Sequence, residues 1–79
     1  MSKFRVNIMP RQEALDPQGQ AVLGALQRLG FKISDCRVGK SVVVDVSEND
    51  KAKGQKIAEE MATKLLANPL IETFTIEAL

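Results

Sequence analysis

Few residues of this 79-residue sequence could carry out chemistry, and the most reactive of them is its single cysteine, Cys36. A thiol nucleophile needs an activating base and an oxyanion site. The sequence has no histidine, which is both the commonest general base and the commonest metal ligand in proteins. A lone cysteine also cannot form an intrachain disulfide or a multi-cysteine metal site. We therefore expect Cys36 to be a structural or incidental thiol and the chain to have no catalytic residue.

Residues 38–41 read Val-Gly-Lys-Ser and end like a P-loop, whose lysine reaches nucleotide phosphates. The likeness fails because Ser34 stands where the first glycine belongs, and because a strand rather than a helix is expected to follow. Gly39 and Lys40 instead fit a two-residue type II′ hairpin turn, which takes glycine at its first central position. The sequence predicts a hairpin turn here, with Lys40 free to contact an anion or a partner surface.

Residues 16–19, Asp-Pro-Gln-Gly, combine a helix start with an unexplained glycine. Asp16 is placed to cap a helix whose first residue is Pro17, where a missing N–H costs nothing. Capping does not account for Gly19, because a glycine in the first helical turn costs about 1 kcal/mol relative to alanine. The sequence therefore predicts that another backbone or a partner approaches Gly19 closely.

The first half of the sequence predicts a strand, a helix and a second strand. Residues 4–8 alternate apolar and polar side chains, as in a strand with one buried face. The helix that begins at Pro17 carries an apolar stripe and ends at Gly30, which fits a left-handed C-terminal cap. Residues 31–37 then alternate poorly and carry charges, as in a strand at the edge of a sheet.

The second half repeats this order with clearer patterns. Residues 41–46 are rich in β-branched valine and predict a third strand. Residues 47–50 offer several N-capping side chains, and an apolar stripe at helical spacing follows over residues 57–66. Pro69 ends this second helix, because the residue before a proline is pushed out of the helical region. Residues 73–77 alternate again and predict a fourth strand.

This order of elements predicts an α+β chain, a ferredoxin-like βαββαβ two-layer sandwich with a four-stranded antiparallel sheet. Right-handed crossovers place both helices on one face and strands two and four at the edges. A chain of 79 residues can close one hydrophobic core, so we expect a single domain over residues 1–79. The predicted core consists of Phe4, Val6, Ile8, Val22, Leu26, Leu29, Val42, Val44, Ile57, Met61, Leu65, Phe74 and Ile76.

Charge and hydropathy argue against several classes of partner. Eleven basic and ten acidic residues give a net charge of +1, too weak a field to favour nucleic acid. No apolar stretch approaches the roughly 20 residues that cross a bilayer, and the first residues lack the apolar core of a signal peptide. A chain this small has little stability to spare, which favours self-association. We expect a cytoplasmic homo-oligomer with no nucleic-acid or membrane partner.

Three strings in order along the chain carry a resemblance to a known family. Residues 14–19 read Ala-Leu-Asp-Pro-Gln-Gly, residues 38–40 Val-Gly-Lys, and residues 65–72 Leu-Leu-Ala-Asn-Pro-Leu-Ile-Glu. In content and spacing they are similar to the PurS family, the small subunits of phosphoribosylformylglycinamidine synthase. Ala14 stands where the family usually has valine, and residues 9–12 are only loosely similar, but the resemblance runs almost end to end.

The resemblance implies a place in a three-component enzyme of de novo purine (IMP) biosynthesis. A synthetase subunit, PurL, would use ATP and magnesium to activate the amide of formylglycinamide ribonucleotide. A glutaminase subunit, PurQ, would release ammonia from glutamine. The small subunit is expected to be a homodimer that bridges these two and helps ammonia pass between them, with no catalytic residue and no cofactor of its own.

On this reading, the residues expected to act are contact residues rather than chemical ones, because surface loops on a rigid scaffold commonly carry binding residues. They lie at the start of the first helix and around the predicted hairpin. The predicted partner-binding residues are Asp16, Pro17, Gln18, Gly19, Arg37, Gly39 and Lys40.

Two other functions remain open at this point. An ACT-like module that binds a small regulatory ligand has the same order of elements, and fold alone does not separate the two. An RNA-binding module also shares the order, but such sheets stack bases on aromatic side chains. Residues 41–46 contain no aromatic, which disfavours RNA binding.

Overall fold

The computed structural model describes all residues of the chain, 1–79, and a three-stranded antiparallel sheet forms its centre. The central strand is β1 (Ser2–Pro10), which pairs along its length with β2 (Lys40–Val46) on one side and β3 (Glu72–Ala78) on the other. The sheet order is therefore β2-β1-β3.

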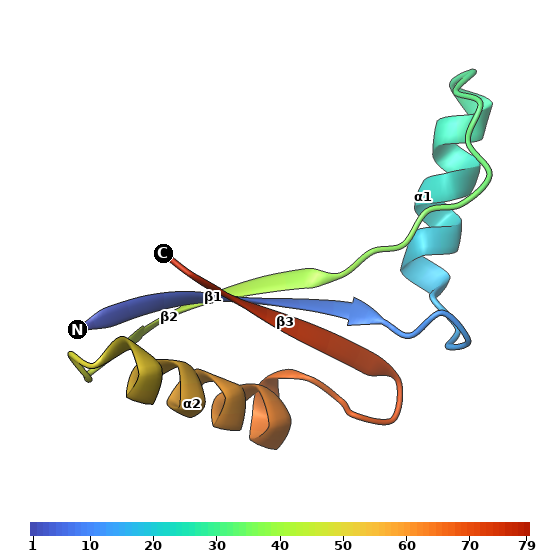
Figure 1. Cartoon of the computed structure of the whole chain (residues 1–79). Helices are drawn as coiled ribbons and strands as arrows, with labels where there is room; N and C mark the ends of the chain where they lie inside the picture. The colour runs from blue at the N-terminus through green and yellow to red at the C-terminus, as the bar shows by residue number, and fades with distance from the viewer.

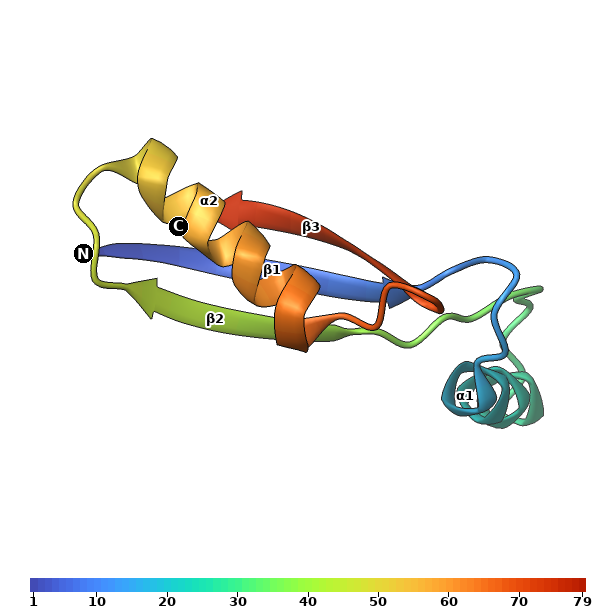
Figure 2. The ribbon, with the colours of Figure 1, turned by 90° about the horizontal axis from the view of Figure 1, so that it is seen from below.

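The two helices occupy very different places. α2 (Lys51–Met61) and the single π-helical turn that continues it, η1 (Ala62–Leu66), pack on one face of the sheet. α1 (Pro17–Arg28) instead projects beyond the end of the sheet, as Figure 1 and the perpendicular view in Figure 2 both show. We call the sheet with α2 and η1 the body, and α1 with residues 29–39 the arm.

The α+β class is confirmed, whereas the four-stranded sheet with both helices on one face is wrong. Residues 31–39 form no strand and run back from the end of α1 to β2 (Figure 1). β1 is nine residues long, and its pairing with β2 extends to Ile8 opposite Lys40. Because β2 is paired with β1 from its first residue, and the chain before it leads away to α1, the sheet gains no fourth strand.

The predicted hairpin turn at Gly39 and Lys40 is also wrong. A type II′ turn needs a positive φ at its first central residue, and Gly30 is the only glycine in the chain with a positive φ. Lys40 is already the first residue of β2. Gly39 is needed for another reason, since a Cβ there would overlap the backbone oxygen of Ile8 and the sulfur of Met9.

Helix boundaries follow the local signals in the sequence. Asp16 caps α1 by accepting a hydrogen bond from the N–H of Gly19 at 3.0 Å, and Pro17 is the first helical residue, as predicted. Gly30, with φ of 99°, follows α1 and adopts the left-handed conformation expected of it. Asp50 caps α2 through the N–H groups of Ala52 and Lys53.

The core of the body lies between the sheet and α2. Alternate residues of β1 point toward the helix, so Phe4, Val6 and Ile8 are almost fully buried, as their spacing predicted. The turn η1 closes with a hydrogen bond from the N–H of Ala67 to the carbonyl of Ala62, five residues earlier, and both alanines are buried. The other face of the sheet is mostly polar and open to solvent, with Met9 and Val43 as exposed apolar exceptions.

Four residues of the predicted core are exposed instead. Val22 in α1 and Leu29 at its C-terminal cap are 38% and 75% exposed. Ile57 in α2 and Leu65 in η1 are 38% and 83% exposed. Their helical spacing marks an apolar face on each helix, and the chain itself covers these faces only in part. Neither the length nor the apolar content of any helix here reaches what a bilayer-spanning segment requires.

Candidate functional site

The predicted contact residues fall into two segments that the structure brings together at the base of the arm. Residues 16–19 begin α1, and residues 37–40 lead from the arm into β2. The side chain of Asp16 joins them, because Oδ1 accepts from the N–H of Gly19 and Oδ2 from the N–H of Val38, each at 3.0 Å. We call Asp16, Gly19, Arg37 and Val38 the latch.

Arg37 adds to the latch from the second segment. Its Nε lies 3.8 Å from Oδ2 of Asp16, and the Asp16 side chain is only 8% exposed. Its guanidinium also donates to the backbone carbonyl of Arg11 and lies 3.5 Å from the carbonyls of Gln12 and Ala14. Arg37 therefore ties the segment that leads from β1 into α1 to the segment that leads back to β2.

Gly19 is the tightest point of the latch. A Cβ at this position would lie 2.5 Å from the backbone oxygen of Cys36 and would overlap the carboxylate of Asp16. The close approach predicted from the sequence is therefore made by the chain's own backbone at Cys36. Glycine is needed here because residues 36–38 cross directly over the first turn of α1.

Hydrogen bonding perturbs the acidity of Asp16. The pKa of its carboxyl lies below the usual value, first because it accepts from the backbone N–H of Val38 and next because it accepts from Gly19. Partial burial opposes this lowering, and Arg37 adds the smallest contribution. Asp16 is therefore a charged structural acceptor rather than an acid or base prepared for proton transfer.

The other predicted contact residues are free of the latch. Pro17 and Gln18 are exposed on the first turn of α1, and Gly39 and Lys40 are exposed where the arm joins β2. Lys40 belongs to a strand rather than to a helix N-terminus, which agrees with the rejection of a P-loop. These four residues are exposed and lie next to latch residues in the sequence.

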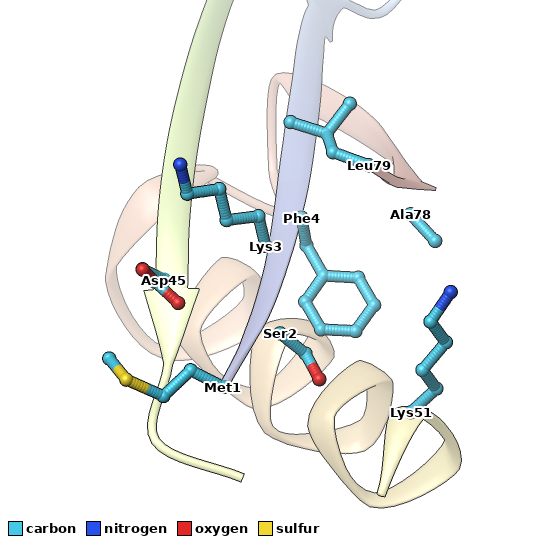
Figure 3. A pocket seen from close by; sticks show the side chains of 8 residues that line it. All are labelled: Met1, Ser2, Lys3, Phe4, Asp45, Lys51, Ala78 and Leu79. Carbon is cyan, nitrogen blue, oxygen red and sulfur yellow. The ribbon is translucent and has the colours of Figure 1, made fainter. Parts of the chain in front are cut away.

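A concavity with a volume of about 270 Å³ lies at the end of the body opposite the arm. Figure 3 shows that the lysine and aspartate side chains around it come from different elements and do not converge on one point. The Ser2 hydroxyl, also in its lining, donates to the carbonyl of Glu48 at 2.8 Å and is not free to act as a nucleophile. The lining residues are Met1, Ser2, Lys3, Phe4, Asp45, Lys51, Ala78 and Leu79.

Two features of the latch had no signal in the sequence. The N–H of Val38 and the carbonyl of Cys36 are backbone groups, so the residue types at these two positions do not reveal the contacts.

The structure offers no metal site. Cys36 is half-buried, and there is no cluster of three or more His, Cys, Asp or Glu side chains that could hold a metal ion.

Comparison with known proteins gives one family along nearly the whole chain. The family described as PurS, phosphoribosylformylglycinamidine (FGAM) synthase, matches residues 3–79. The chain is 46% identical over 78 residues to phosphoribosylformylglycinamidine synthase subunit PurS of Mycobacterium leprae, covering 96% of this chain and 94% of that protein. The subunit of the same name from Bacillus subtilis is 35% identical over 78 residues, covering 98% and 92%.

Solved structures of related proteins resemble this chain in fold as well as in sequence. The purS subunit of phosphoribosylformylglycinamidine synthase from Thermotoga maritima superposes with a TM-score of 0.91 at 28% identity, covering 99% of this chain and 91% of that one. A chain of the structure described as PurLQS from Thermotoga maritima gives a TM-score of 0.89 at 28% identity, covering 99% and 96%. Because these superpositions cover 99% of the chain, the likeness includes the arm as well as the body.

Proposed function

The chain belongs to the PurS family, and on that premise we propose that it is the small subunit of phosphoribosylformylglycinamidine synthase in de novo purine (IMP) biosynthesis. The observation that carries the proposal is its 46% identity, along nearly the whole of both chains, to a subunit of that name. The ACT-like alternative is not favoured, because the relatives named above are PurS subunits matched from end to end.

In this proposal the chain binds two larger proteins, the synthetase subunit PurL and the glutaminase subunit PurQ. The likeness to a chain of the Thermotoga maritima structure named PurLQS supports such an assembly. The chain bridges the two enzymes and assists the transfer of ammonia from the glutaminase to the synthetase. It works in the cytoplasm as one domain over residues 1–79, in a homodimer or a higher homo-oligomer.

The chain supplies no catalytic residue to the carbon-nitrogen ligase reaction. Its histidine-free sequence and the engaged carboxylate of Asp16 support this part of the proposal. ATP and magnesium are used by the synthetase subunit, and this chain binds no cofactor. Its contribution to the rate is the distance and orientation that it imposes on two active sites in other proteins.

Seven residues at the base of the arm are proposed to contribute to partner binding, in two ways. Asp16, Gly19 and Arg37 fix the arm and act through its position. Pro17, Gln18, Gly39 and Lys40 are exposed beside the latch and are proposed to touch a partner subunit directly. Because their backbone is held by the latch, little ordering entropy is lost when they are bound.

The experiment that tests the proposal compares two nitrogen sources. Purified synthetase and glutaminase subunits are assayed with glutamine and then with ammonium, each with and without this chain. We expect glutamine-dependent synthesis to require the chain and ammonium-dependent synthesis to need it much less, because free ammonium bypasses transfer between subunits. If neither rate changes and size-exclusion chromatography detects no complex, the proposal is wrong.

A pair of lysine variants tests the contact surface. Lys40→Glu should raise the apparent Kd of the chain for its partner subunits by about tenfold, or ~1.4 kcal/mol, because it reverses a charge within the contact. Lys56→Glu makes the same change at an exposed site on α2, outside this surface, and should leave the Kd unchanged. If both variants change the Kd equally, Lys40 is not part of the contact surface.

A further inference from the structure

Residues 68–72, where η1 leads into β3, form a turn whose backbone is held by hydrogen bonds. The carbonyl of Asn68 accepts from the N–H groups of Ile71 and Glu72, at 3.1 and 2.7 Å. Its side chain accepts from the N–H of Leu70 at 3.1 Å, and the Glu72 carboxylate accepts from the N–H of Asn68 at 2.7 Å. Because residue 69 is a proline and has no N–H, every backbone donor of the turn is paired. We call residues 68–72 the leucine turn.

Arg11 fastens the leucine turn to the base of the arm. Its side chain donates to the carbonyl of Pro69 from both Nε and Nη2, at 3.2 and 3.0 Å. Its backbone N–H donates to the carbonyl of Ile71 at 2.7 Å, and its backbone carbonyl accepts from Arg37 of the latch. Figure 1 and Figure 2 both show the connection from α2 to β3 at the end of the sheet from which α1 projects. The leucine turn and the latch therefore form one hydrogen-bonded unit.

The requirements of a turn explain only part of this sequence. Asparagine and proline suit the first two positions of a β-turn, because the one supplies a side-chain acceptor and the other a preset φ. Turns otherwise favour glycine and short polar residues, with glycine preferred at the last position. Leu70 and Ile71 occupy the last two positions here, and their side chains are 85% and 49% exposed. Neither the turn nor the core of the body accounts for these two apolar side chains.

Two more exposed apolar side chains lie at this end of the body. Leu15 is 93% exposed and directly precedes Asp16 of the latch. Met9, also exposed, lies on β1 opposite Thr73, the second residue of β3. Single apolar residues scattered over a surface are normal, whereas a group of them at one place marks an interaction site. The group here lies where the body meets the arm, next to the residues proposed above to touch a partner subunit.

A hollow of about 250 Å³ opens beside the leucine turn, with Pro69 and Phe74 in its lining. Its charged and hydroxyl side chains are already hydrogen-bonded within the chain. Arg11 donates to the carbonyl of Pro69, the Thr63 hydroxyl donates to carbonyls of α2, and the Glu72 carboxylate accepts from the leucine turn. The hollow therefore suits a side chain of a docking protein better than a small polar ligand.

We propose that the leucine turn inserts Leu70 and Ile71 into an apolar pocket of one larger subunit of the enzyme, the same subunit that meets Lys40 beside the latch. The inference rests on the proposed function and adds an apolar anchor to the contacts already assigned there. One partner meets both surfaces because Arg11 joins the leucine turn to the latch. The turn is ordered before it binds, so little conformational entropy is lost on docking, and a few buried side chains commonly supply most of the binding energy of an interface.

Titration calorimetry against each purified larger subunit tests the insertion. Leu70→Asp should raise the Kd at least about tenfold for the subunit whose Kd Lys40→Glu also raises, because it places a charge in an apolar contact. Leu70→Met keeps the side chain apolar and similar in volume, and its Kd should stay within about threefold of the wild-type value. The matched control, Leu79→Asp, alters an exposed leucine at the far end of the body and should leave the Kd for both subunits unchanged.

A second variant tests whether the leucine turn must be held in place. Arg11→Lys keeps the positive charge but loses the planar group that donates twice to the carbonyl of Pro69. Hydrogen exchange at the Ile71 amide should become faster than in the wild-type chain. The Kd for the same subunit should rise about threefold, because the turn is then ordered only on binding. Unchanged exchange with an unchanged Kd would contradict the role given to Arg11.

Two further outcomes would overturn the insertion, provided that circular dichroism shows Leu70→Asp to be folded. The first is weakened binding to a different subunit from the one that Lys40→Glu affects. The second is a changed mass of the chain alone by light scattering with unchanged subunit binding, which would assign the leucine turn to a contact between copies. A wild-type chain that binds neither subunit would contradict the proposed function together with the insertion. Wild-type binding that Leu70→Asp leaves intact would contradict the insertion alone.

Discussion

The body and the arm are stabilised by different kinds of interaction. In the body, Phe4, Val6 and Ile8 are buried between a sheet and a helix, so its stability comes from apolar burial spread over many contacts. In the arm, the single fully buried position is a glycine, and the fold depends on a few hydrogen bonds to Asp16 and from Arg37. The comparison teaches that a projecting helix can be positioned by polar contacts at its base, without a core of its own.

The largest effect should come from removing a core side chain of the body. Phe4→Ala deletes a fully buried ring that lies against Gly54, and should cost about 3–5 kcal/mol of unfolding free energy. A domain of this size has about 4–12 kcal/mol in total, so urea denaturation followed by circular dichroism should show a protein near its unfolding threshold. Leu70→Ala, at an exposed leucine, is the control and should change the midpoint little.

A change at the base of the arm should act more locally. Gly19→Ala forces a methyl group against the carbonyl of Cys36 and should cost about 1–3 kcal/mol, the usual range for overpacking. Hydrogen exchange should speed up at the Val38 amide, whose acceptor is displaced, while the amide of Val6 in the body stays protected. Equal acceleration at both amides would mean that arm and body do not open separately.

Two helix caps give a matched pair across the two regions. Asp50→Ala removes the cap of α2 and should cost about 1 kcal/mol. Asp16→Ala removes the cap of α1 and also the acceptor of the Val38 N–H, and should cost about 2 kcal/mol. The two values come from thermal or urea unfolding, and a larger loss for Asp50→Ala would contradict the role of Asp16 as the centre of the latch.

The smallest effect should be a loosening of the arm in acid. The pKa of Asp16 in the folded chain is lowered from 3.8, so the unfolded chain binds the proton more readily. The stabilisation is therefore fully present above pH 3.8 and is lost as the pH falls through the lower folded value. Hydrogen exchange at the Val38 amide should become faster in acid than its intrinsic pH dependence accounts for. An Asp16→Asn variant should not show this extra acceleration.

The sequence predicted those parts of the fold that depend on near neighbours. The alternation of Phe4, Val6 and Ile8 was enough to identify a strand with one buried face, and Asp16 with Pro17 located the start of α1. These signals are local, because capping and alternation involve residues only a few positions apart. The sequence also singled out Asp16, Gly19 and Arg37, which the structure brings together in the latch, and the backbone that approaches Gly19 belongs to the chain itself.

The sequence did not predict that residues 31–37 form no strand, nor the place of α1. Residues 31–37 have a composition that suits an edge strand, but whether they pair depends on where the arm carries them, which is a long-range property. The apolar stripes that contain Val22 and Leu65 indicate that these side chains belong in an apolar contact. Helical periodicity does not state which molecule supplies the other half of that contact.

The two ends of the chain emerge together at the end of the body farthest from the arm (Figure 1). The N–H of Leu79 donates to the carbonyl of Lys3 at 3.0 Å, so β1 and β3 hold them side by side. Neighbouring termini are what make circular permutation and tandem fusion tolerable in a small fold. An affinity tag, a fluorescent label or a short tether to a second copy can therefore be attached at either end without approaching the arm or the latch.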